Sequence, residues 1–356
     1  MKRTKKLLIN GVFLSGTLNG IERYAYEITI RMDKLCQKDE ISIVIPTTAN
    51  NIPEYRNLEV IRLKKNIKSN SAWRMLTLQW FILTHRQYMI LDFGNSCLPF
   101  APGIVFLHDI YCEFFPEDFI TIQDKFTRLY SRFQYRLIVH LAKKIVTVSE
   151  YSKNQIGETF NIDKDKISVV YSSADHISSI SSDMSVFDQF PTLAEKPFYF
   201  SLGSLSKRKN IKWINEYAKK HPETYFAVSG TGLSTVKIDE LEKDNLKNLI
   251  FLGYLDDSKV KALMERCKAL ILPSYYEGFG LTPLEALSCG SQINIARAAS
   301  LPEIYGNTAH YIDPYNTDVD LDRLLNEPVD DPSEILQKYT YDKAAEQVYT
   351  IIKEFF

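Results

Sequence analysis

Short apolar runs of four to seven residues recur along the chain, and longer stretches with helical periodicity separate them. Such runs, rich in β-branched and aromatic residues, predict buried strands, and the longer stretches predict helices. The strands predicted in the first half are Leu7–Phe13, Ile41–Pro46, Val60–Leu63, Tyr88–Phe93, Ile104–His108, Lys144–Val148 and Ile167–Tyr171. Those predicted in the second half are Pro197–Leu202, Tyr225–Ser229, Leu249–Tyr254, Ala269–Pro273, Gln292–Ala296 and His310–Asp313.

This alternation of strands and helices predicts the fold class. Strands that are apolar at nearly every position are typical of parallel sheets covered by helices on both faces. We therefore expect an α/β protein with two Rossmann-like, doubly wound parallel-sheet domains that face each other across a cleft. The predicted boundaries are an N-terminal domain over residues 1–175, a serine-rich linker over 176–196, a C-terminal domain over 197–335 and a C-terminal helix over 336–356 that could cross back to the N-terminal domain.

Composition and charge bear on the environment of the chain. A length of 356 residues with 45% hydrophobic content supports two cores. Residues 1–150 carry 21 Lys and Arg against 14 Asp and Glu, and the remainder carries 22 against 30, so one domain is expected to face an anionic partner. Five scattered cysteines without a Cys-x-x-Cys pair are typical of a reducing compartment. Neither a signal peptide nor a transmembrane helix is expected, because polar residues interrupt the apolar stretches.

Two glutamates, Glu277 and Glu285, bracket a glycine turn where residues 277–285 read EGFGLTPLE. A predicted strand precedes this turn and a predicted helix follows it. Gly278 and Gly280 allow the backbone to approach a ligand closely, and the start of a helix suits a phosphate. With a carboxylate on each side to hold sugar hydroxyls, the pattern predicts a nucleotide-sugar site.

One end of this motif also has a purely structural interpretation. Residues 282–285 fit a capping box, in which Thr282 caps a helix with Pro283 in its first turn, and Glu285 reaches back to the Thr282 backbone N–H. Glu277 has no comparable partner in the sequence, so it stays the stronger functional candidate.

Two candidate positions follow predicted strands in the N-terminal half. Gly16, Asn19 and Gly20 lie in a loop that enters an amphipathic helix, which is either a substrate-contact loop or an ordinary turn. The loop does not match Gly-x-Gly-x-x-Gly, which disfavours a dehydrogenase. His108, followed by Asp109, ends a predicted strand, where functional groups of such sheets gather, although a lone histidine is as often structural.

Two candidate loops follow strands of the C-terminal half. The loop after Gly203 carries three consecutive cations, of which Arg208 would clamp phosphate oxygens and Lys209 would act as a point charge. A solvated surface cluster is the alternative for such a run. Gly253 and Tyr254 end a further strand, where the backbone could contact a nucleotide base.

Other short motifs argue against competing chemistries. The loop at residues 230–232 lacks the Gly-Lys-Ser/Thr of a P-loop, which disfavours a kinase or an ATPase. Two Asp-x-Asp pairs, at 163–165 and 318–320, lie in polar segments and not directly after a buried strand. We therefore expect no catalytic metal and no cofactor, so a leaving diphosphate would depend on Arg208, Lys209 and a helix N-terminus.

A basic helix is predicted around residues 125–136, with Arg128, Arg132 and Arg136 on one face and aromatic residues between them. Such a helix can lie on an anionic membrane surface. A solvated face on a helix that packs by its aromatic residues fits the same pattern.

Taken together, these residues resemble the retaining, GT-B-fold glycosyltransferases of family 4, and most closely the mannosyltransferase-B-like branch of bacterial polysaccharide biosynthesis. The resemblance spans almost the whole chain. Its most specific element, residues 274–290, is similar to the family's Glu-x7-Glu signature. Supporting elements are residues 20–24, 108–109, 146–152, 203–210 and 300–304.

The resemblance implies a role for each candidate residue. Glu277 would contact the donor's hexose and Glu285 its ribose, while two cations would neutralise the diphosphate. The implied catalytic residues are His108, Arg208, Lys209 and Glu277. The implied substrate-binding residues are Gly16, Asn19, Gly20, Gly203, Gly253, Tyr254, Gly278, Phe279, Gly280, Leu281 and Glu285.

Three departures from the family pattern bear on the donor more than on the reaction. Residues 290–293 read GSQI where the family usually has Gly-Thr-Pro-Val. Thr282 stands where many members are apolar or carry proline, and Arg297 stands where a small residue is common.

The implied function is a cytoplasmic, retaining, metal-independent hexosyltransferase. It would move a hexose or deoxyhexose from a nucleotide diphosphate sugar, with GDP-mannose favoured, to a lipid-linked or growing cell-surface polysaccharide such as O-antigen or capsule. Peripheral contact with an anionic plasma membrane through the basic N-terminal domain is a further implied partner, and nucleic acid is not. Two alternatives stay open, a nucleotide-sugar epimerase of GT-B architecture and a non-catalytic glycan-binding partner of a transferase complex.

Overall fold

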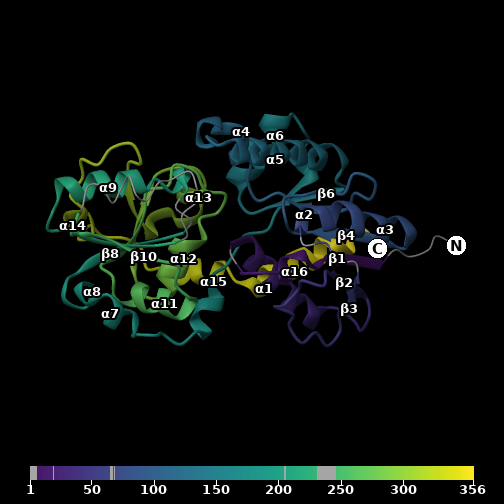
Figure 1. The fold of residues 1–356 in the computed structure, drawn as a ribbon, viewed down its shortest axis with the longest axis horizontal. Helices are drawn as coiled ribbons and strands as arrows, with labels where there is room; N and C mark the ends of the chain where they lie inside the picture. The colour runs from purple at the N-terminus through teal and green to yellow at the C-terminus, as the bar shows by residue number, and fades with distance from the viewer. Residues whose placement is uncertain (1–5, 19, 65–66, 68, 204–205, 231–245) are drawn as a thin grey trace. The chain divides into compact units, whose positions relative to one another are not determined.

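The computed structural model describes residues 6–18, 20–64, 67, 69–203, 206–230 and 246–356 (Figure 1). Its chain forms two compact units. Unit 1 consists of Met1–Phe114, Thr127–Ser172 and Tyr341–Phe356. Unit 2 consists of Phe115–Phe126 and Ser173–Thr340. The C-terminal helix therefore folds with unit 1, and a short segment from the first half of the sequence folds with unit 2.

Unit 1 is built on a parallel sheet, which over the described residues has seven strands in the order β3-β2-β1-β4-β5-β6-β7. The strand order reverses between β1 and β4, and the carboxyl ends of strands at such a switch point are where ligands of these sheets bind. The strands are β1 (Lys6–Asn10), β2 (Ile41–Ile45), β3 (Glu59–Arg62), β4 (Tyr88–Asp92), β5 (Ile104–Phe106), β6 (Lys144–Thr147) and β7 (Ile167–Val169).

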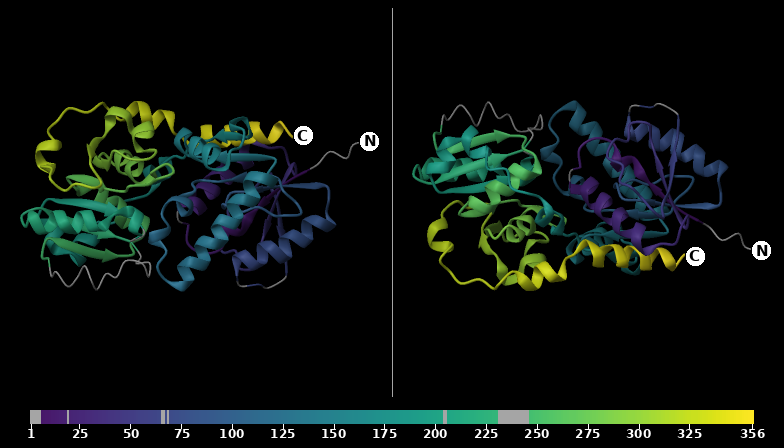
Figure 2. Two further views of the ribbon diagram at one scale, coloured as in Figure 1. Left: turned by 90° about the horizontal axis from the view of Figure 1, so that it is seen from above. Right: turned by 90° about the horizontal axis from the view of Figure 1, so that it is seen from below.

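Alternate strand residues point to opposite faces of this sheet, and apolar residues lie on both. Helices therefore cover both faces. On one face, Leu7, Ile9 and Phe106 pack against α1 (Gly20–Leu35) and α16 (Tyr341–Lys353), the yellow helix that lies beside α1 in Figure 2. On the other face, Leu8 and Val105 pack against the remaining large helices. These are the π-helical η2 (Trp73–Leu78), α3 (Gln79–Thr84), the part of α5 (Ile122–Leu141) from Thr127 onward, and α6 (Glu150–Phe160).

Short helical segments complete the connections of the first half. They are η1 (Gly11–Leu14), α2 (Asn70–Ala72), α4 (Tyr111–Phe114), η3 (Pro116–Asp118) and η4 (Lys164–Lys166).

Unit 2 repeats this architecture with a parallel sheet, of six strands in the described residues, in the order β10-β9-β8-β11-β12-β13. The strands are β8 (Phe198–Leu202), β9 (Tyr225–Ser229), β10 (Leu249–Gly253), β11 (Ala269–Leu272), β12 (Gln292–Ala296) and β13 (His310–Ile312). Tyr199 and Ile271 pack with α9 (Ile211–Lys220) and α14 (Leu321–Leu324) on one face, and Figure 1 shows α7 (Val186–Gln189), α8 (Pro191–Glu195) and α11 (Asp257–Arg266) on the other.

The remaining described helices of unit 2 connect its strands or lie where the chain enters and leaves the unit. They are η5 (Asp175–Ser179), η6 (Lys207–Lys209), α12 (Leu281–Ser288), α13 (Leu301–Tyr305), η7 (Gly306–Thr308) and α15 (Ser333–Lys338). The serine-rich stretch around residues 176–196 thus contains η5, α7 and α8.

The strands that the apolar runs predict are all present in the described part of the chain, and most end one to three residues earlier than predicted. Every residue of β2 and of β11 is buried, as strands covered on both faces require. The predicted fold class, two Rossmann-like parallel-sheet bodies in one α/β chain, is confirmed.

Candidate active site

The glycine turn before α12 has the conformation that its sequence predicts. β11 ends at Leu272, and α12 begins at Leu281 after Gly280, whose φ of +81° lies in the left-handed region. A Cβ at Gly280 would overlap the side chain of Leu301, so the position requires glycine for both its backbone and its space. Pro283 lies in the first turn of the helix, as predicted.

The capping-box interpretation of this motif is wrong. Gly280 occupies the N-cap of α12, and in the described structure no side chain caps that end of the helix. Thr282 lies inside the first turn and not before it. The carboxylate of Glu285 instead lies 3.4 Å from His176 Nε2, and both side chains are largely buried.

Glu277 is buried between two cations. Its Oε1 lies 2.8 Å from Lys209 Nζ, and its Oε2 lies 3.7 Å from Arg208 Nη1. Burial acts to raise the pKa of Glu277, but the neighbouring charges of Lys209 and Arg208 hold it below its ordinary value. The structure therefore brings together three of the four predicted catalytic residues as an ionised cluster with one excess positive charge.

The loop that carries the two cations is anchored by Asn210. This residue adopts a left-handed conformation, and its side-chain amide donates to the carbonyls of Pro273, 3.0 Å away, and Pro314, 2.7 Å away. Pro273 directly follows β11, so Asn210 ties the cationic loop to the strand that leads to Glu277. Gly203 lies beside Lys209 and has a φ of +137°, and a Cβ there would sit 3.2 Å from the lysine's Cε. The alternative of a solvated surface cluster does not hold for Lys209, whose side chain is only 16% exposed.

Hydrogen bonds from the α13 region fix the backbone of the turn. Ser300 Oγ donates to the Glu277 carbonyl at 2.9 Å, and the Tyr305 hydroxyl donates to the Gly280 carbonyl. The Phe279 ring is buried edge-on against Tyr339, with ring centroids 5.6 Å apart. Phe279 thus supports the turn from inside, so its side chain is not offered to a ligand.

Gly253 ends β10, and Tyr254 follows it, at the carboxyl ends of the strands of unit 2. The Gly253 carbonyl accepts hydrogen bonds from Gly230 N–H and from Ser229 Oγ, both at 2.9 Å. The Tyr254 side chain is largely exposed. This strand end therefore offers an aromatic side chain to a ligand, while the carbonyl of Gly253 is used within the fold.

In unit 1, His108 is buried at the carboxyl end of β5. Its Nε2 lies 2.8 Å from the Phe93 carbonyl, which only accepts, so Nε2 carries the proton and Nδ1 is the acceptor. Burial lowers the pKa of His108, so the imidazole is neutral at physiological pH. Its ring packs edge-on against Tyr24, 5.6 Å between centroids. A neutral, oriented imidazole can accept a hydrogen bond from a hydroxyl.

The glycine loop of unit 1 follows β1 and η1. Gly16 has a φ of +94°, and its N–H donates to Asn50 Oδ1 at 3.1 Å. Gly20 is the first residue of α1 and is exposed. Asn19 lies outside the described residues.

Comparison with known proteins is consistent with this geometry. A model of "Glycosyl transferases group 1" matches residues 185–347, and a model of "Glycosyltransferase Family 4" matches residues 18–176. O-antigen chain mannosyltransferase B of Escherichia coli is 26% identical over 344 residues, 88% of each protein. O-antigen chain mannosyltransferase RfbU of Salmonella typhimurium is 27% identical over 267 residues, 70% of this chain and 71% of that protein.

The chain is a glycosyltransferase, with a Family 4 match over its first half and a group 1 match over its second. Its fold is GT-B, as expected from the resemblance. Anabaena HepE, solved in complex with UDP and glucose, matches it with a TM-score of 0.69 over 98% of this chain and 99% of that one, at 18% identity.

Sequence reasoning missed a buried polar cluster in unit 1 of the glycosyltransferase. Asp92, at the end of β4, accepts hydrogen bonds from Asn10 Nδ2 at 2.8 Å and Ser96 Oγ at 3.1 Å, and Arg74 Nε lies 3.5 Å away. Asn10 lies within one predicted strand and Asp92 lies near the end of another, so pairing of those two strands could have pointed to their contact. Arg74 gave no such signal, because it reaches the cluster from the π-helical η2.

His176 was missed as well. It lies in η5, within the serine-rich stretch that the sequence suggested was a linker, and η5 packs against α12. No local pattern links it to Glu285, because only the fold of unit 2 brings the two together.

The arginines of α5 contact residues of α4. Arg128 Nε donates to the Cys112 carbonyl and Arg132 Nε pairs with Glu113, each at 2.8 Å, and Arg136 also reaches Glu113, at 3.4 Å. Of the interleaved aromatic side chains, which the alternative of a solvated helix face packs into the core, Tyr135 is buried, whereas Phe126 is 68% exposed and Phe133 is 51% exposed. Leu129 on the same helix is 63% exposed.

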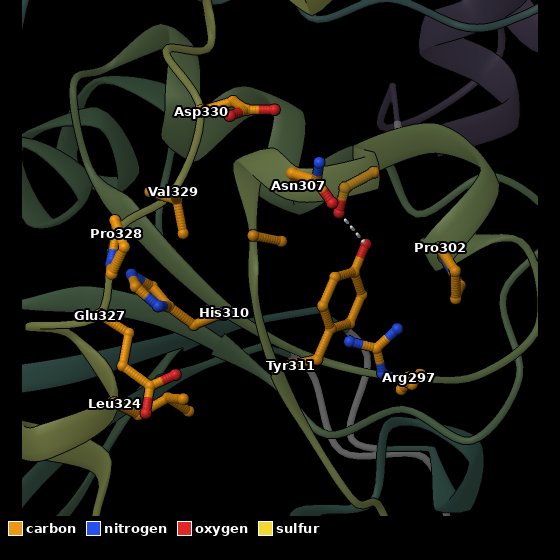
Figure 3. A pocket seen from close by; sticks show the side chains of 12 residues that line it. Arg297, Pro302, Asn307, His310, Tyr311, Leu324, Glu327, Pro328, Val329 and Asp330 are labelled. Atoms are coloured by element: carbon orange, nitrogen blue, oxygen red, sulfur yellow. Dashed lines mark hydrogen bonds between the residues drawn. The ribbon is translucent and has the colours of Figure 1, made fainter.

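Arg297, a departure from the family pattern, takes no part in the Glu277 cluster. Its guanidinium lies 4.2 Å from the centre of the Tyr311 ring, and the Tyr311 hydroxyl donates to the Gly306 carbonyl at 2.7 Å (Figure 3). Both residues line a pocket of about 620 Å³ beside the edge strand β13, which His310 and Glu327 also line.

Two further observations concern metals and membranes. Among the described side chains, no group of three or more His, Cys, Asp or Glu residues is placed to hold a metal ion. None of the helices in the described ranges is long and apolar enough to cross a membrane.

Proposed function

We propose that this glycosyltransferase moves a hexose or deoxyhexose from a nucleotide diphosphate sugar, GDP-mannose favoured, to a lipid-linked or growing cell-surface polysaccharide acceptor, with retention of anomeric configuration. The observation that carries the proposal is the buried Glu277 carboxylate, 2.8 Å from Lys209 and 3.7 Å from Arg208 on the turn before α12. The names of the similar O-antigen chain mannosyltransferases support the sugar and the acceptor class.

The cluster suits a diphosphate as the leaving group. Arg208 and Lys209 would pair with the diphosphate oxygens, and the N-terminus of α12 would add a positive dipole end. The carboxylate of Glu277 would then be released from Lys209 to accept hydrogen bonds from the hexose hydroxyls. Glu285, four residues into the helix after Leu281, would contact the ribose.

The proposed reaction is a substitution on one face of the sugar. The bond between the anomeric carbon and the phosphate oxygen breaks, and the acceptor hydroxyl oxygen bonds to the anomeric carbon from the same side. The acceptor proton passes to the departing phosphate oxygen, so no enzyme nucleophile and no metal is needed. The two cations stabilise the negative charge that develops on the diphosphate. The proposed contribution of unit 1 is His108, as a neutral hydrogen-bond acceptor, with the loop from Gly16 to Gly20.

Substitution of the cluster tests the proposal. With GDP-mannose and a lipid-linked acceptor, Glu277→Gln, Lys209→Ala and His108→Ala should each lower kcat/KM by about a hundredfold or more, because each removes a contact made in the transition state. Lys212→Ala is the matched control, because the Lys212 side chain is 80% exposed and lies only three residues further on. Full activity of all three variants, with UDP- and dTDP-sugars tried as well, would sink the proposal.

We also propose that the enzyme is cytoplasmic and contacts the inner face of the plasma membrane through unit 1. The support is an apolar surface on the helical layer that holds α3 and α5. Trp80 is 70% exposed, and Phe100, whose N–H donates to Gln79 of α3, is 76% exposed. Gln134 of α5 accepts from Cys97 N–H, so the same loop contacts both helices. The surplus of Lys and Arg in residues 1–150 favours anionic lipid.

A further inference from the structure

A short segment from the first half of the sequence folds against the cluster of unit 2. Residues 115–118, here called the strap, comprise Phe115 and η3 and belong to unit 2, whereas Phe114 before them belongs to unit 1. The Phe115 ring lies 5.2 Å from Tyr275 and 5.5 Å from Tyr276, centroid to centroid. The strap therefore packs on the two residues that directly precede Glu277.

Asp118 connects the strap to both loops of the cluster. Its Oδ2 accepts a hydrogen bond of 3.0 Å from the Tyr275 hydroxyl, and its Oδ1 lies 4.0 Å from Lys207 Nζ. Lys207 Nζ also donates to the Glu117 carbonyl at 2.9 Å. The Asp118 residue is only 8% exposed, so these contacts are made largely out of water, where charge-assisted hydrogen bonds are strong.

The two residues held by the strap are the sequence neighbours of the cluster. Lys207 directly precedes Arg208 and Lys209, and Tyr275 lies two residues before Glu277. A hydrogen bond of 3.2 Å from Tyr275 N–H to the Arg208 carbonyl joins the two loops. The strap thus completes a ring of contacts with Lys207, Arg208 and Tyr275, next to the Glu277 cluster.

We propose that Asp118 is a positioning residue of the donor site, which holds Arg208 and Lys209 at the spacing that a diphosphate requires. The inference rests on the proposed function of those two cations. The inference adds that the strap sets part of the affinity for the diphosphate. Asp118 lies only ten residues after His108 in the sequence, but the strap belongs to unit 2 and His108 to unit 1.

The ionisation of the contact partners is consistent with this role. Burial raises the pKa of Asp118 above its ordinary value, although Tyr275 and Lys207 act to lower it. Burial, with the neighbouring Asp118 carboxylate, raises the pKa of Tyr275 well above its ordinary value, so the phenol keeps its proton and remains a donor.

Nucleotide pairs that differ by one phosphate test the inference. Binding of GDP and GMP, and of the UDP and dTDP pairs, is measured by calorimetry on the full chain. Tyr275→Phe removes the hydrogen bond but keeps the ring, and Asp118→Asn removes the charge that faces Lys207. Each should weaken the diphosphate about tenfold and leave the monophosphate within about twofold. The double variant should bind the diphosphate no more weakly than the more impaired of the two single variants, because both changes break one contact network.

Controls separate this inference from a general loss of structure and from the proposed function itself. Tyr225→Phe is the matched control, because Tyr225 is a partly exposed tyrosine of the same unit that begins β9, at the end of the sheet opposite the cluster. The positioning role would be overturned if Tyr275→Phe and Asp118→Asn weakened diphosphate and monophosphate binding equally, or weakened neither. In that case the proposed function would still stand if Lys209→Ala weakened diphosphate binding. A wild-type chain that binds no nucleoside diphosphate would overturn the proposed function and this inference with it.

Discussion

At Glu277, a buried carboxylate is kept ionised by its neighbours. Burial of a carboxylate disfavours its charged form, and here two cations within 3.7 Å reverse that effect. The resulting site is preorganised, because both cations are already held near each other before a ligand arrives. A ligand with two adjacent phosphates can replace the carboxylate as the partner of Arg208 and Lys209.

Glu285 has a partner of its own, His176, 3.4 Å away. If His176 holds the Glu285 carboxylate in place for the ribose, His176→Leu should weaken GDP about fivefold, since one hydrogen bond contributes about 1 kcal/mol. His176→Gln, which keeps a donor, should restore most of the affinity. The measurement is calorimetry with GDP and with inorganic pyrophosphate, which has no ribose. A loss of equal size for pyrophosphate would contradict a role at the ribose.

Among the elements, α12 depends on the turn that starts it. Gly280 and Gly290 flank the helix with nearly the same φ, +81° and +82°, but a Cβ at Gly280 would overlap Leu301 and one at Gly290 would meet open space. Alanine at Gly290 should therefore cost about 1 kcal/mol of unfolding free energy, for its backbone alone.

Gly280→Ala should cost about 2 kcal/mol more than Gly290→Ala, because Leu301 must move out of a close-packed core. It should also lower kcat/KM, since the Gly280 carbonyl and the Glu277 backbone belong to one hydrogen-bonded turn. Urea unfolding of both variants, at unchanged m-value, measures the difference. Equal costs at the two positions would show that Leu301 does not set the constraint.

The elements also show how far the sequence could predict this protein. Buried strands such as β2 and β11 were predictable, because each run of apolar residues must be covered on both faces. The glutamate turn was predictable because its glycines, proline and acids lie within nine residues. His176 and Asp118 were not, since each meets its partner only after the chain has folded into unit 2. The capping-box interpretation was wrong because Gly280, and not Thr282, is the N-cap residue of α12.

Across the whole molecule, apolar exposure and charge are unevenly distributed. The large exposed apolar side chains of α5 and of the α3 layer belong mostly to unit 1, and the surplus of basic residues lies in the first 150 residues. The arginines of α5 are engaged with Glu113 and Cys112, so the apolar side chains are the better candidates for membrane contact. Insertion of such side chains is less sensitive to salt than contact through charge alone.

Vesicle binding tests this distribution. The wild-type chain should co-sediment with vesicles of phosphatidylglycerol and phosphatidylcholine, and Leu129→Gln combined with Phe133→Gln should weaken the binding about tenfold or more, because each apolar side chain that is partly buried contributes about 1 kcal/mol. Tyr315→Gln is the matched control, because Tyr315 is also exposed but belongs to unit 2. Part of the wild-type binding should persist at 1 M salt, where the Debye length is about 3 Å. If high salt abolished all binding and the double variant bound normally, basic residues elsewhere would carry the contact, and α5 would be an ordinary exposed helix.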